Sequence, residues 1–171
     1  MWRYVGADRP DFAERPGEGQ ESVWDYPRPP VLAPDSRAVR VVHEGADVAL
    51  THRAVRVLET ASPPTFYVPE DDVDLSRLVE LEGPQSVCEW KGAARYWALA
   101  LSRERTMVGW SYPSPSRAFK SIEGFFSFYP GRINCYVDDE HVQPQPGGFY
   151  GGWITSEVVG PFKGEPGTGH W

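Results

Sequence analysis

The sequence predicts an all-β domain, mainly antiparallel, of about seven or eight strands with two short helices. Seventeen glycines and seventeen prolines among 171 residues are too many chain breakers for a helical bundle. Hydrophobic residues make up 40% of the chain and aromatic residues 13%, which argues against general disorder. Apolar residues recur mostly at every second position, the period of a half-buried strand. The length suits a single domain.

The first strands follow from a turn signal. Residues 39–43 and 47–51 flank Glu44-Gly45-Ala46, which predicts a hairpin, and residues 55–59 follow closely enough to predict a three-stranded meander. The longest predicted strand covers residues 93–101. Further strands are predicted at residues 107–112, 125–129 and 133–137.

Two short helices are expected between these strands. One covers residues 74–79 and begins after Asp71 or Asp72 as its N-cap. The other covers residues 115–122, with Ser114 as the N-cap, proline at the first helical position and Gly124 just beyond the end.

The body of residues 39–143 lies between two irregular segments. Residues 1–38 hold six prolines and several aromatic residues, so we expect an arm that packs on the body. Residues 144–171 are rich in glycine, proline and large apolar side chains, and we expect an ordered belt that supports the fold by packing. Such a belt could wrap a neighbouring subunit and form a homo-oligomer.

Charge and composition exclude several classes of partner. The net charge is −7, and the chain has no basic run, so nucleic acid is not expected. No apolar run approaches the ~18 residues of a membrane span, and residues 1–4 lack the apolar core of a secretion signal, which favours a cytoplasmic protein. Cys88 and Cys135 have no paired-cysteine spacing, so we expect reduced thiols, no metal and no cofactor.

Three groups of residues could carry chemistry, and each has a structural alternative. Asp72 and Asp74 form a D-x-D that could share Mg²⁺, or they could cap a helix. Lys91 could bind an anion or lie in water, and Cys88 would be a catalytic thiolate only beside a histidine. Trp110 and the aromatic residues near it could line a cavity or belong to the core.

Five blocks in this order resemble the domain-of-unknown-function family numbered 427. The resemblance covers roughly residues 39–143 and implies a small Mss4-like β-tent. Glu89 departs from the family, which more often has proline at this position. The blocks are Arg53 with Glu59, Tyr67-Val68-Pro69 with Asp72-Val73, residues 88–94 with Tyr96, Trp110-Ser111-Tyr112-Pro113, and Ile122-Glu123-Gly124 with Phe128-Tyr129.

Several Mss4-like proteins hold zinc on paired C-x-x-C knuckles. This chain has no such pair, so the resemblance implies no metal here. The family also carries a nucleotidyltransferase-like label. Nucleotidyl transfer would need a Gly-Ser phosphate turn before Asp72, and the chain has none there.

The matching polar and aromatic positions predict one ligand-binding pocket, because they mix charges with rings as small-molecule sites do. The first hypothesis is therefore a small-molecule-binding domain, and whether it is an enzyme is left open. A non-catalytic interaction or scaffold protein is the alternative, and metal-dependent nucleotidyl transfer ranks third. The predicted pocket residues are Arg53, Glu59, Tyr67, Asp72, Lys91, Tyr96, Trp110, Tyr112 and Tyr129.

Overall fold

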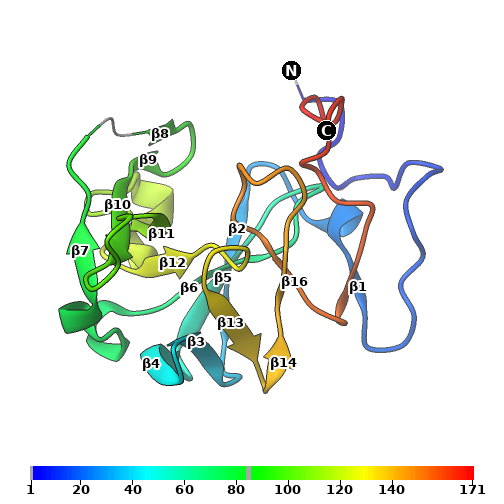
Figure 1. The fold of residues 1–171 in the computed structure, drawn as a ribbon. Helices are drawn as coiled ribbons and strands as arrows, with labels where there is room; N and C mark the ends of the chain where they lie inside the picture. The colour runs from blue at the N-terminus through cyan, green and yellow to red at the C-terminus, as the bar shows by residue number, and fades with distance from the viewer. Residues whose placement is uncertain (1, 84–85) are drawn as a thin grey trace.

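A computed structural model describes residues 2–83 and 86–171, and strands dominate it (Figure 1). The strands lie in several small sheets, and nearly all paired strands are antiparallel. The predicted all-β, mainly antiparallel class is therefore confirmed. The finer assignment to a Mss4-like tent stays a prediction.

The predicted hairpin lies in a four-stranded sheet with the order β14-β13-β3-β4. Glu44 and Gly45 at its turn have positive φ angles of 49° and 75°, as a type I′ hairpin turn requires. Val39 and Val41 are fully buried on one face of β3. The strands of this sheet are β3 (Val39–His43), β4 (Ala46–Thr51), β13 (Asn134–Val137) and β14 (Glu140–His141).

The predicted meander is wrong, because its third strand joins another sheet. After β4 the Arg53 amide donates to Thr51 Oγ1 at 2.9 Å, and this local turn directs β5 away from β4. The new sheet has the order β2-β5-β6. Its strands are β2 (Val31–Asp35), β5 (Ala54–Leu58) and β6 (Thr65–Tyr67).

A second four-stranded sheet has the order β12-β11-β10-β7. The strand predicted at residues 93–101 ends earlier, at Leu99, because the Ser102 amide donates to the Leu99 carbonyl oxygen and turns the chain. Leu101 is consequently 97% exposed. The strands are β7 (Leu78–Glu80), β10 (Arg95–Leu99), β11 (Met107–Ser111) and β12 (Phe126–Phe128).

The short helices are all of the 3-10 type in the described residues. The first predicted helix is only one turn, capped by Asp74, because β7 begins at Leu78. The second begins after Ser116, two residues later than predicted, and the Ser116 hydroxyl donates to the Trp90 carbonyl oxygen instead of capping it. The helices are η1 (Val23–Asp25), η2 (Glu70–Asp72), η3 (Leu75–Arg77) and η4 (Arg117–Ile122).

The arm and the belt pack on the body and on each other, and the two chain ends lie close together (Figure 1). Trp24 of the arm contacts Trp171 with ring centroids 5.2 Å apart. Trp153 of the belt is fully buried in the main core. Short strand pairs join these segments: β1 (Glu21–Ser22) with β17 (Val158–Val159), and β15 (Gln143–Pro144) with β16 (Trp153–Ile154).

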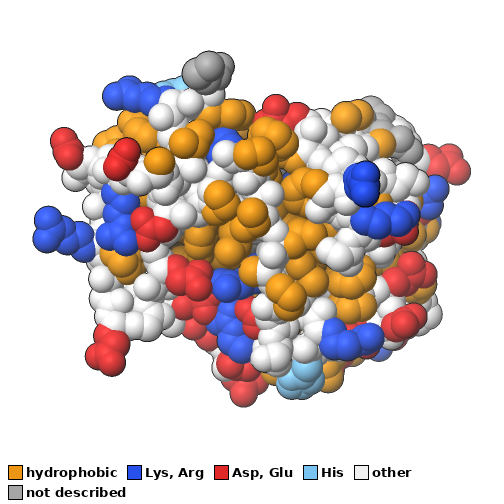
Figure 2. Space-filling model, turned by 180° about the vertical axis from the view of Figure 1, so that it is seen from behind, with side chains coloured by type: hydrophobic (Ala, Val, Ile, Leu, Met, Phe, Trp, Pro, Cys, Tyr) orange, Lys and Arg blue, Asp and Glu red, His pale blue; other side chains and the backbone are white. Residues whose placement is uncertain are grey.

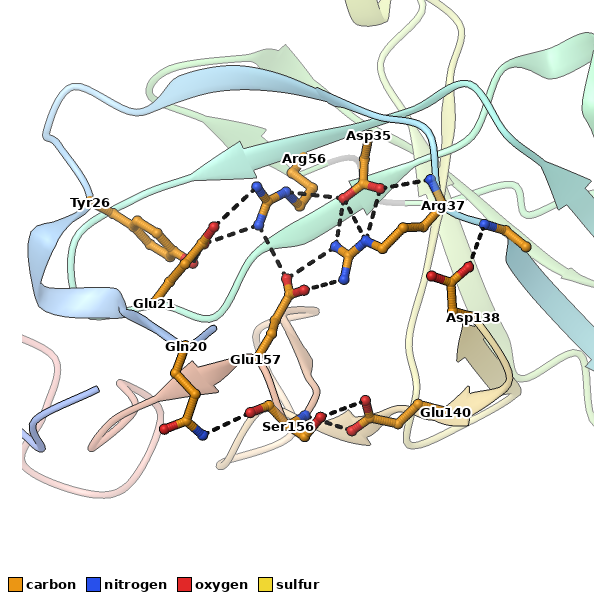
Figure 3. Close-up of polar contacts among 11 residues, drawn as sticks. Gln20, Glu21, Tyr26, Asp35, Arg37, Arg56, Asp138, Glu140, Ser156 and Glu157 are labelled. Atoms are coloured by element: carbon orange, nitrogen blue, oxygen red, sulfur yellow. Dashed lines mark hydrogen bonds and ion pairs between the residues drawn. The ribbon is translucent and has the colours of Figure 1, made fainter. Parts of the chain in front are cut away.

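A network of ion pairs also joins the arm and the belt to the body (Figure 3). Arg56 of β5 lies 3.1 Å from Glu21 and 3.2 Å from Glu157, and its Nε lies 3.3 Å from Asp35. Arg37 pairs with Asp35 and with Glu157. Burial alone would raise the pKa of Asp35, but hydrogen bonds and charge from Arg37 outweigh it and hold that pKa below its usual range.

We expect this network to make the fold sensitive to acid. Because folding lowers the pKa of Asp35 and of Glu21, the unfolded chain binds protons at higher pH. The stabilisation is therefore present above about pH 4, near the ordinary carboxyl pKa values, and is lost as the pH falls through the folded-state values. Urea unfolding measured at a series of pH values should show this fall, with a smaller slope in Asp35→Asn. An equal slope in the variant would contradict the assignment.

Candidate functional site

A cavity of about 460 Å³ lies where the three-stranded sheet, the β10–β11 strands and the belt meet. A small hairpin of β8 (Val87–Cys88) and β9 (Gly92–Ala93) contributes to its rim. Figure 2, which shows the molecule from behind, has hydrophobic side chains gathered near the middle of the view, with charged side chains mainly around them. The volume falls within the usual ~300–1,000 Å³ of small-molecule pockets.

The structure brings seven of the nine predicted pocket residues to this one cavity. They come from strands of two different sheets and from the turns and loops beside strands, which explains why no single motif contains them. The seven are Glu59, Tyr67, Lys91, Tyr96, Trp110, Tyr112 and Tyr129.

Arg53 and Asp72 lie elsewhere and pair with each other. Arg53 Nη2 is 3.0 Å from Asp72 Oδ1, and the Thr51 hydroxyl donates to the same carboxylate at 2.6 Å. These hydrogen bonds hold the pKa of Asp72 below its usual range, so its carboxylate is a weak base. Asp74 accepts from the Ser76 amide and pairs with Arg77. Both carboxylates of the D-x-D are thus engaged in local contacts.

Aromatic rings form one wall of the cavity. The Trp110 indole N–H donates to the Tyr67 hydroxyl at 3.2 Å, and the Trp110 and Tyr129 ring centroids are 4.5 Å apart. Burial raises the pKa of Tyr129 to about 12 and raises that of Tyr67 further, so both hydroxyls are neutral at pH 7. Gly151 of the belt leaves room for the indole, because a Cβ there would lie 2.1 Å from it.

Lys91 supplies a cation at this wall. The turn between β8 and β9 presents its ammonium 5.7 Å from the ring centroids of Tyr112 and Phe119. Among the described residues, no carboxylate oxygen lies within 4 Å of the Lys91 Nζ, and no hydrogen bond engages it. Tyr112 is 94% buried, and its hydroxyl has no hydrogen-bond partner among the residues that the structure describes. Both groups are therefore available to a ligand.

Glu59 differs from Lys91 because it is already paired. Arg28 Nε lies 3.1 Å from Glu59 Oε1, and the Arg28 side chain is 1% exposed. The other Arg28 nitrogens donate to the carbonyl oxygens of Tyr4 and Thr60. Glu59 is consequently the counter-ion of a buried arginine.

Cations outnumber anions in the cavity lining. Lys91, Arg132 and Lys163 line it together with one carboxylate, that of Glu59, in the described part of the chain. The whole chain carries a net charge of −7, yet two of its three lysines lie here. The cavity therefore favours negatively charged ligands.

Sequence reasoning missed the contributions of the belt and of Arg132. Arg132 stacks on the Tyr129 ring, 4.3 Å from its centroid, and donates to the Met107 carbonyl oxygen. One weak signal could have pointed to Lys163 as a cavity residue: it is the single lysine or arginine in residues 144–171. Its place beside the body depended on a chain path that strand patterns do not encode.

Thiol and metal chemistry have little support among the residues described. Cys88 lines the cavity, but no histidine does so in residues 2–83 and 86–171. Cys135 is buried, which raises the pKa of its thiol. The same residues contain no group of three or more His, Cys, Asp or Glu side chains placed to hold a metal ion. None of their helices is long and apolar enough to cross a membrane.

These features define a small β domain with an aromatic, cationic cavity. Residues 31–139 match the family model described as Domain of unknown function (DUF427), and the chain belongs to this family. The resemblance seen in the sequence is thereby confirmed. The match begins at β2 and ends before the belt, so Lys163 and Gly151 lie outside it. No curated protein matches the chain significantly.

Proposed function

We propose that the cavity binds a small aromatic molecule that carries an acidic group. The observation that supports this most is Lys91, an ammonium without a carboxylate partner among the described residues, set at a wall of aromatic rings. The rings of Trp110 and Tyr129 would stack on the ligand. The Lys91 ammonium would bind the acidic group through a charge-assisted hydrogen bond.

The arrangement of the predicted residues favours binding over a scaffold role. A scaffold would leave such side chains paired with one another, as Arg53 and Asp72 are. A binding site needs them to converge, as seven of the nine do. The proposal concerns binding rather than catalysis, because Glu59, the one carboxylate in the described cavity lining, is paired with Arg28, and an ion pair makes a carboxylate a weaker base. Oligomerisation through the belt stays a prediction.

Lys91→Met should weaken binding of an anionic aromatic ligand by about tenfold or more, since a hydrogen bond to a charged group contributes ~1.5–3 kcal/mol. A thermal-shift screen of neutral and anionic aromatic metabolites would supply the ligand, and titration calorimetry would compare the variants. Lys120→Met is the matched control, because Lys120 pairs with Glu123 and does not line the cavity. Equal affinities for all three proteins would place the binding site elsewhere.

A further inference from the structure

Tyr112 is a buried tyrosine whose hydroxyl has no hydrogen-bond partner in residues 2–83 and 86–171. The residue lines the cavity and is 6% exposed. Its hydroxyl is not sealed into the interior, because the buried side-chain polar atoms without a partner, among the residues described, are Arg56 Nε and Ser127 Oγ. The Tyr112 hydroxyl therefore opens onto the cavity that the residue lines.

Two other buried tyrosines have partners for their hydroxyls. The Tyr67 hydroxyl, in the same cavity, accepts from the Trp110 indole N–H at 3.2 Å. The Tyr26 hydroxyl, outside the cavity, donates to the Glu21 carboxylate at 2.6 Å. Polar groups on residues as buried as these are normally hydrogen-bonded, because an unpaired one loses water and gains nothing in return. A partner for the Tyr112 hydroxyl therefore has to come from the cavity.

Lys91 places a positive charge beside the same ring. Its ammonium lies 5.7 Å from the Tyr112 ring centroid, and no carboxylate oxygen of the described residues lies within 4 Å of it. Burial raises the pKa of Tyr112, as does nearby Tyr67, while the charge of Lys91 acts in the opposite direction. The Tyr112 hydroxyl therefore keeps its proton at neutral pH and lies within the field of the ammonium.

The ammonium and the hydroxyl together fit an ionised acid. An ammonium only donates hydrogen bonds, whereas a neutral hydroxyl donates one and also accepts. An ionised carboxylate or phosphate has two or more oxygens that accept, so it can take one hydrogen bond from each of the two groups at once. A ligand amine in this place would be charged as well, and the Lys91 ammonium would repel it.

We propose that the Tyr112 hydroxyl donates a hydrogen bond to the acidic group that the Lys91 ammonium binds. This inference rests on the proposed function, and it makes Tyr112 a specificity-determining residue that selects an acid with at least two free oxygens. The ligand class is then an aromatic carboxylate or phosphate, with its acidic group between Lys91 and Tyr112 and its ring on the aromatic wall.

Titration calorimetry of the full chain and of Tyr112→Phe tests the inference, with benzoate and phenyl phosphate as the probes. The two probes distinguish a carboxylate from a phosphate as the acidic group. Tyr112→Phe should weaken binding of the tighter probe by about tenfold or more, as expected for the loss of one hydrogen bond to a charged group. The melting temperature of the ligand-free variant should be unchanged or raised, because the hydroxyl has no partner among the described residues.

Tyr26→Phe is the matched control, since it also removes one hydroxyl from a buried tyrosine. It should lower the melting temperature, because the hydrogen bond to Glu21 is lost. It should leave the affinity for both probes within about twofold, because Tyr26 does not line the cavity.

The double variant Lys91→Met/Tyr112→Phe tests whether both groups bind the same acid. Its fold-loss in affinity should differ from the product of the two single losses by more than about twofold, because two donors to one group are coupled. If Lys91→Met weakens binding but Tyr112→Phe does not, or if the losses simply multiply, the inference is overturned and the proposed function stands. If the native protein binds neither probe, or Lys91→Met binds them unchanged, both proposals are wrong.

Discussion

Trp153→Ala is expected to cost about 3–5 kcal/mol of unfolding free energy, the usual loss for deleting a large aromatic side chain from a core. Trp153 has no exposed surface, and its ring stacks on Phe66 with centroids 4.9 Å apart. Its indole N–H also donates to the Phe128 carbonyl oxygen at 2.9 Å. The belt thus inserts one side chain into the main core, and its removal leaves a cavity there.

Phe149→Ala is the matched control in the same belt. Phe149 is 77% exposed, so its truncation should change stability by no more than ~0.5 kcal/mol. Urea unfolding of both variants measures the difference. A Trp153→Ala protein as stable as Phe149→Ala would show that the burial of Trp153 does not stabilise the fold.

Arg28→Met should destabilise the protein by about 3–5 kcal/mol, because removing one partner of a buried ion pair leaves the other uncompensated. The Arg28 side chain is 1% exposed, while Glu59 retains 24% exposure, which places the expected loss at the lower end of that range. The substitution also leaves the Tyr4 and Thr60 carbonyl oxygens without their donor.

Arg9→Met provides the comparison on the surface. Arg9 pairs with Asp25, and both side chains are more than 40% exposed, so the loss should stay below about 1 kcal/mol. The double variant Arg28→Met/Glu59→Gln should recover part of the stability lost in Arg28→Met. If the double variant is less stable by the simple sum of the two losses, Arg28 and Glu59 do not stabilise each other.

The sequence was most informative where local rules decide the structure. Alternating valines and the Glu44-Gly45 turn predicted the β3–β4 hairpin, because side-chain period and positive φ are local properties. The meander failed because the choice of partner for β5 depends on β2, whose proline-rich sequence resembled an irregular arm. The short helices were placed close to their true positions but shortened by the strands and contacts around them.

In the candidate site, too, the residues with a recognisable chemistry could be predicted, whereas those placed by long-range packing could not. Seven residues could be grouped before the structure was known, because their chemistry and the family resemblance singled them out. Arg53 and Asp72 share that chemistry, yet a local hydrogen-bond network keeps them together at a different place. Lys163 and Arg132 could not be predicted, because their position depends on how the belt and the loops pack against the body.

A crystal structure of the protein with the tightest-binding anionic aromatic compound from the screen tests the central claim most directly. The account predicts the compound in the cavity, its ring against Trp110 or Tyr129 and an acidic oxygen within hydrogen-bond distance of the Lys91 ammonium. A compound bound at saturating concentration outside this cavity, or inside it with its acidic group turned away from Lys91, would contradict the account.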